Sequence, residues 1–229
     1  MKKTLLTISS LIIAGSLIAG CNTTKVEDES TKTTSSNPQT TDGEKSEDRK
    51  TIDEKAWKDV TIVQDGVKYD FPTNAKDWIS SVNITFQEEP AKDSELIQAG
   101  LDKYYNYYVQ ALAIQSVLEI IQVEGVALEK DFDNLYLLTK IIEEEQIKRT
   151  EHIDPDQYDK RDPNQRLAAI KEWKAPSEKM VKAIEYTKQL LNDINVAINK
   201  DGKGDLFGVA YQVDGQNTSE LEVFVKSEE

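Results

Sequence analysis

Between Ile97 and Ile121, apolar side chains recur every three or four residues, a spacing that puts them on one face of an α-helix and does not suit a β-strand. The members of this stripe are Ile97, Leu101, Tyr104, Tyr108, Ala111, Ile114, Leu118 and Ile121. Asp93 precedes the stripe and is of a type preferred at helix N-caps, and Gly125 follows it and disfavours continuation. The sequence therefore predicts one long amphipathic helix whose apolar face must be buried against other elements.

Three later segments show the same periodicity. A second helix is predicted from near Asp131. A third begins at Asp162 and Pro163, which suit the cap and first position of a helix, and it breaks near Pro176. A last long helix stops at residues 201–204, where glycine accepts a left-handed C-cap. The inward positions of the three segments are Phe132, Leu135, Leu138 and Ile142, then Leu167, Ile170 and Trp173, then Met180, Ile184, Leu191, Ile194 and Ile198.

Residues 51–90 have a different character and predict a small β-rich unit. Two β-prone runs, 60–63 and 67–71, flank an Asp-Gly pair at 65–66. Asp-Gly between such runs is a strong hairpin signal because glycine accepts the positive φ of a type I′ turn. Residues 82–86 are a candidate third strand.

The fold class that follows is mainly α: an antiparallel helical bundle of three to four long helices with a small N-terminal β-hairpin unit. We expect residues 51–90 and the helical domain at 91–229 to pack as one globular unit. Two interpretations stay open for residues 206–225. Alternating apolar residues there favour a hairpin, whereas Asn217 and Glu220 favour a short helix, which we prefer.

The N-terminus carries a sorting signal. Lys2 and Lys3 precede an apolar run that ends in Leu17-Ile18-Ala19-Gly20-Cys21. A basic start, a short apolar middle and a small-residue exit are typical of a secretory signal peptide, here residues 1–20. The exit resembles the lipobox of bacterial lipoproteins. The resemblance implies cleavage before Cys21, a diacylglyceryl lipid on its thiol and anchoring at the extracytoplasmic face of the cell membrane.

Residues 21–50 are rich in serine and threonine and contain little that could form a core. They are predicted to be the lipidated cysteine and a disordered tether, with a composition closer to Gram-positive lipoproteins than to Gram-negative ones. Cys21 is the only cysteine of the chain, so an intramolecular disulfide is excluded.

The charge excludes some partners. The formal net charge is −14, and removing residues 1–20 takes away two lysines and no acid, which leaves −16 on the mature chain. Such a surface repels phosphate backbones and anionic lipid headgroups. We therefore expect no nucleic-acid partner, and a membrane association that depends on the lipid alone.

The inventory of reactive side chains is small. His152 is the only histidine, which excludes the usual zinc sites and leaves no convincing catalytic triad. We assign no catalytic residue and no cofactor beyond the lipid on Cys21. Four aspartates crowd one loop and are weak candidates for a calcium site, with a solvated loop preferred: Asp154, Asp156, Asp159 and Asp162.

Tyrosine is concentrated at Tyr104, Tyr105, Tyr107 and Tyr108. Tyrosine combines a large contact area with a polar tip, so these four are a candidate binding patch, although packing beneath neighbouring elements is the more common role. The stripe predicts that Tyr104 and Tyr108 point inward and that Tyr105 or Tyr107 lies near the surface.

The preferred function is a non-enzymatic binding or adaptor module at the cell envelope, with a protein or envelope component as partner. One alternative is a cell-wall enzyme that uses acidic residues alone, which predicts two partly buried carboxyls facing each other across a cleft. A second is a small-ligand-binding lipoprotein, which predicts an apolar pocket of roughly 300 Å³ or more lined by the tyrosines.

Overall fold

The computed structural model describes residues 53, 55–92, 94–154, 156–159, 161–213 and 215–227. The predicted signal peptide, the predicted lipidation site at Cys21 and the predicted tether lie outside the described residues. The elements of the described part are β1 (Lys58–Asp59), α1 (Ala75–Gln87), α2 (Glu95–Gln98), α3 (Lys103–Leu118), β2 (Val123–Glu124), α4 (Val126–Thr150), α5 (Pro163–Lys171), α6 (Glu178–Asn199) and α7 (Thr218–Lys226).

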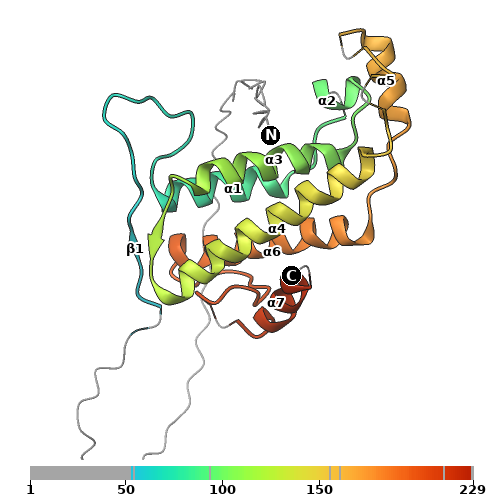
Figure 1. Cartoon of the computed structure of the whole chain (residues 1–229). Coiled ribbons are helices and arrows are strands. Elements are labelled where there is room, and N and C mark those ends of the chain that lie inside the picture. The colour runs from blue at the N-terminus through green and yellow to red at the C-terminus, as the bar shows by residue number, and fades with distance from the viewer. Residues whose placement is uncertain are drawn as a thin grey trace, which may run out of the picture. The chain divides into compact units, whose positions relative to one another are not determined.

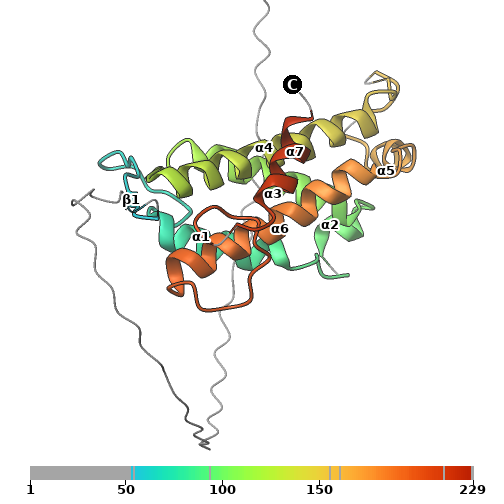
Figure 2. The same ribbon diagram turned by 90° about the horizontal axis from the view of Figure 1, so that it is seen from below.

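Four helices form the body of the molecule, which confirms the predicted helical bundle. α4 packs against both α3 and α6, and α6 also packs against α1. These neighbours run in opposite directions, as Figure 1 shows. α7 crosses the face made by α4 and α6 (Figure 2), and its Phe224 ring lies 5.3 Å from that of Tyr186. α5 lies at the end of the bundle opposite β1 (Figures 1 and 2).

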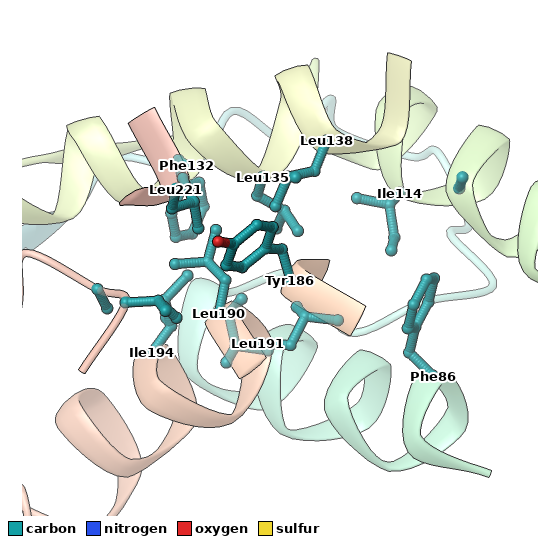
Figure 3. Close-up of a cluster of buried hydrophobic side chains, with 14 of the residues drawn as sticks. Phe86, Ile114, Phe132, Leu135, Leu138, Tyr186, Leu190, Leu191, Ile194 and Leu221 are labelled. Carbon is teal, nitrogen blue, oxygen red and sulfur yellow. The ribbon is translucent and has the colours of Figure 1, made fainter. Parts of the chain in front are cut away.

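The core lies where these helices meet (Figure 3). Phe86 of α1, Ile114 of α3, and Leu135 and Leu138 of α4 are fully or almost fully buried, as is Leu190 of α6. Burying a side chain of this size contributes about 1.5–3 kcal/mol. The apolar stripes of separate helices therefore supply the main stabilisation.

The predicted hairpin is wrong in its pairing. The turn at 65–66 forms, with Gly66 at φ +80° and the Val67 N–H donating to the Gln64 carbonyl. The runs on either side do not pair with each other. Instead β1 pairs antiparallel with β2, and the Val60 N–H donates to the carbonyl of Gln122 beyond α3. The two-stranded sheet thus joins segments far apart in the sequence.

The predicted strand at 82–86 is also wrong, because these residues lie in α1. Asn74 caps this helix through a hydrogen bond of 2.9 Å from the Asp77 N–H. Trp78, Ile79 and Phe86 are buried on one face. Their helical spacing, which lets them reach α6 and α3, outweighs the β propensity of the intervening residues.

The long helix predicted from 97 to 121 is divided in two. Gly100, at φ +84°, separates α2 from α3, and Asp102 caps α3 by accepting a hydrogen bond from the Tyr105 N–H. α3 buries Tyr107, Ala111 and Ile114. Ala111 and Ile114 are buried as the stripe predicts, whereas the buried tyrosine is Tyr107, and the predicted Tyr104 and Tyr108 are only half-buried against the core.

The other helices follow the predictions more closely. α4 begins at Val126, five residues before the predicted Asp131. Asp162 caps α5 and Pro163 is its first residue. α6 ends at Asn199, after which Gly202, at φ +72°, donates to the Val196 carbonyl.

The region at 206–225 contains a helix, α7, and no strand within its described residues. Two buried carboxylates hold the segment before α7. Asp193 accepts from the N–H groups of Phe207 and Val209, both at 2.8 Å. Asp131 does the same for Tyr211 and Gln212 at 2.6 and 2.8 Å. Because these N–H groups bond to side chains, they are not available for the ladder that the hairpin alternative requires.

Candidate functional site

The most suitable recognition site is a groove at the α5 end of the bundle, which we call the aromatic groove. Its volume is about 520 Å³, within the usual range for small-molecule sites. α3, α4, α5 and the segments next to α5 line it. The lining residues are Tyr105, Tyr108, Gln146, Ile147, Thr150, Ile153, Asp154, Tyr158, Arg166, Ala169, Ile170 and Trp173.

Three rings form a continuous aromatic wall. The ring centre of Tyr105 lies 5.3 Å from that of Trp173 and 5.5 Å from that of Tyr108. Burial, followed by the charges of Tyr105 and Glu143, raises the pKa of Tyr108, so its hydroxyl is held in the neutral form. The wall therefore offers apolar faces together with phenol groups that can donate hydrogen bonds.

A buried arginine supports this wall. Arg149 of α4, 4 % exposed, donates to the carboxylate of Asp102 and, at 2.9 Å, to the carbonyl of Lys174. Its guanidinium carbon lies 5.6 Å from the ring centre of Trp173, a cation–π contact. Arg149 thus joins the start of α3 to the segment after α5, and the tyrosine and tryptophan sides of the groove keep a fixed relation.

The same arginine orients Gln146, which is 4 % exposed and lines the groove. Arg149 donates to its Oε1 at 2.9 Å. Because arginine has no acceptor, the amide must present its oxygen to Arg149. Its Nε2 has no hydrogen-bond partner among the described residues and remains available to a ligand.

The four tyrosines of the predicted patch separate into two pairs. Tyr105 and Tyr108 line the groove. Tyr107 is 2 % exposed and its ring centre lies 5.3 Å from that of Phe86, so a surface position for Tyr107 is wrong. Tyr108, predicted to point inward, is half-buried against the core as well as lining the groove. Tyr104 is half-buried against the core and does not line the groove.

Sequence reasoning missed the second half of the site. Tyr158 and Trp173 lie far along the chain from the tyrosine cluster. Trp173 was predicted only as an inward position of a helix. The exposed Ile147 also belongs to the groove, and no feature of the sequence linked it with the tyrosines.

The four aspartates of the calcium alternative act locally. Asp154, Asp159 and Asp162 each accept a backbone N–H two residues further on, at 3.0, 2.9 and 2.8 Å. These are turn and cap interactions. The described residues contain no group of three or more His, Cys, Asp or Glu side chains arranged to hold a metal ion. His152 contacts the carbonyl of Glu172 at 2.9 Å.

The enzyme alternative requires facing carboxyls. Of the described residues that line the groove, Asp154 alone carries a carboxylate. Asp131 and Asp193 are both fully buried, and each is occupied by two backbone N–H groups. The groove thus lacks the acid–base pair that such a reaction needs.

No protein-family model, curated protein or solved structure matches this chain. Within the described residues, no helix combines the length and the apolar character needed to cross a membrane.

Proposed function

We propose that the chain is a lipid-anchored, non-enzymatic binding protein of the cell envelope whose recognition site is the aromatic groove. The observation that carries the proposal is a groove of about 520 Å³ whose aromatic wall is held by a buried arginine. Rings fixed before binding lose little entropy when a ligand arrives, and this favours affinity. The size and the tyrosine lining match the pocket that small-ligand binding predicts, whereas the single carboxylate does not support hydrolysis.

The groove is tested by site-specific crosslinking in intact cells. A photoreactive residue replaces Ile147, which is 53 % exposed in the groove, and in a matched control it replaces Val126, which is 56 % exposed at the other end of α4. We expect adducts, detected as a mass increase or a shifted band, from position 147 only, and their loss when Trp173→Ala is added. Equal adduct yields at the two positions would overturn the proposed site.

The anchor is tested separately. Radiolabelled palmitate is expected to enter the wild-type chain, whereas the Cys21→Ala variant stays unlabelled and leaves the membrane fraction. Equal labelling of both forms would contradict the lipid attachment.

A further inference from the structure

The aromatic groove contains two unpaired charges of opposite sign. Arg166 of α5 is exposed, and its side chain forms no hydrogen bond or ion pair with any described residue. The carboxylate of Asp154 accepts one backbone N–H, from Asp156 at 3.0 Å, and no described residue forms an ion pair with it. The two side chains line the same groove without pairing with each other. Each can therefore meet a charge on a ligand without first breaking a contact within the described part of the chain.

The balance of charge in the groove limits what fits. The positive charge of Arg149 is already met by Asp102, and among the described lining residues the charges of Arg166 and Asp154 cancel. A simple anion is disfavoured by the −16 of the whole mature chain. A simple cation could pair with Asp154, but Arg166 would repel it, and the cation carries no anionic group that could pair with Arg166 in turn. A ligand that is neutral overall and carries one charge of each sign meets neither penalty.

The rest of the lining offers apolar surfaces that can pack against an apolar substituent of a ligand, and a hydrogen-bond donor that can bind an acceptor of the ligand. Tyr105, Tyr108 and Trp173 present ring faces, and Ile147 adds an exposed aliphatic surface. Gln146 Nε2 is a donor without a partner among the described residues, on a side chain more than nine-tenths buried. Such a donor favours a carbonyl or carboxylate oxygen, because leaving it desolvated and unbonded would cost binding energy.

We propose that the groove binds a small zwitterion with an apolar side chain, of the chemical class of a free amino acid or a short peptide. Arg166 and Gln146 donate hydrogen bonds to its carboxylate or carbonyl oxygens, and the carboxylate of Asp154 binds its ammonium group. The aromatic wall packs against its side chain. This inference rests on the proposed function and names the ligand class of the same groove.

The test is calorimetric titration of the mature, detergent-solubilised chain with matched ligands. These are L-phenylalanine and the dipeptide phenylalanyl-phenylalanine, each with free ends, with an acetylated amine, with an amidated carboxylate, and blocked at both ends. We expect binding of at least one free-ended ligand, and affinity about tenfold lower when either end is blocked, as befits loss of a charged hydrogen bond. The two ligand sizes distinguish a site for amino acids from one for peptides.

Variants then assign each end. Arg166→Gln should abolish the preference for a free carboxylate, and Asp154→Asn should abolish the preference for a free amine. Arg161→Gln and Asp156→Asn remove the same charges from nearby residues that do not line the groove, and should leave affinity unchanged.

Two outcomes would overturn the inference. If the doubly blocked ligands bind as tightly as the free-ended ones, the groove recognises apolar groups alone. The zwitterionic ligand class is then wrong, while the proposed function is unaffected. If no ligand of either size binds, the ligand class is wrong, and crosslinking at Ile147 decides the proposed function independently.

Discussion

Arg149 and Asp102 form an ion pair in which both terminal guanidinium nitrogens donate to the two carboxylate oxygens. The arginine side chain is 5 % exposed and the aspartate side chain 40 %. The same carboxylate caps α3 through the Tyr105 N–H. One contact therefore joins the end of α4 to the start of the helix that carries the tyrosines of the groove.

Asp102→Asn is expected to lower the free energy of unfolding by about 1–3 kcal/mol, because the buried guanidinium loses its ionic acceptor. Asparagine is itself a good N-cap, so the change isolates the ion pair from the capping interaction. Urea unfolding followed by circular dichroism measures the effect. Asp156→Asn, in an exposed loop, is the control and should stay within about 0.5 kcal/mol of wild type. A similar small change for both variants would mean that the pair contributes little.

The helical bundle could be predicted because the apolar spacing and the capping residues that define each helix lie within the sequence of that helix. α6 buries Met180, Ile184 and Leu191 at the spacing read from the sequence, and α5 begins at the predicted Asp162 and Pro163. These signals act within one or two turns of the chain. These local signals can be read without knowing which elements pack against the helix.

The errors arise where distant residues decide the structure. α1 becomes a helix because its apolar face reaches α6 and α3, although residues 82–86 prefer strands. β1 finds its partner beyond α3 rather than across the Asp-Gly turn. Trp173 meets Tyr105 across 67 intervening residues. One half of the groove was therefore predicted only as a tyrosine-rich run. In the other half, Asp154, Ile170 and Trp173 were noted for other roles, and nothing in the sequence linked them with the tyrosines.

The stability of the bundle is expected to depend on pH through Asp131. Burial is the largest cause that raises the pKa of Asp131, and the charge of Asp193 adds to it; two backbone N–H groups oppose the rise, and the pKa reaches about 7. Because this folded-state pKa exceeds the ordinary 3.8, the folded protein retains a proton that the unfolded chain releases between about pH 4 and pH 7. The contribution of this group is therefore fully present below that window and is lost as pH rises through it.

We expect the free energy of unfolding to fall by roughly 2–3 kcal/mol between pH 5 and pH 8, because about two pH units separate pH 5 from the folded-state pKa and each unit is worth about 1.4 kcal/mol. Asp131→Asn carries no proton to lose, so its profile should be nearly flat, whatever its absolute stability. Asp133→Asn, on the exposed side of the same helix, should keep the wild-type slope. Denaturant midpoints at several pH values measure all three, and an unchanged slope in Asp131→Asn would refute the assignment.

Gly125 lies where β2 meets α4 and permits no side chain. Its φ is +142°, and a Cβ there would lie 2.6 Å from the carbonyl oxygen of Ala56 and 2.8 Å from the Cβ of Trp57. Gly125→Ala is therefore expected to cost more than about 2 kcal/mol, since left-handed strain is joined by a clash with backbone. Gly66 has φ +80° and open space around it, so Gly66→Ala introduces backbone strain without a clash and is expected to lower the free energy of unfolding by about 1–2 kcal/mol. Thermal unfolding measures both, and equal losses would show that the clash is relieved at no cost.

The segment before α7 is expected to depend on Asp193. Its two oxygens accept the N–H groups of Phe207 and Val209, and the second of these bonds is fully buried. Asp193→Ala leaves both donors unpaired at about 1–3 kcal/mol each. Because the loss is confined to this segment, hydrogen exchange at the Val209 amide should accelerate more than exchange at amides in the middle of α4. Asp205→Ala, an exposed position whose carboxylate makes no hydrogen bond to a described residue, should leave both rates unchanged. Uniform acceleration throughout the protein would instead mean that Asp193 stabilises the whole bundle and not the 206–213 segment.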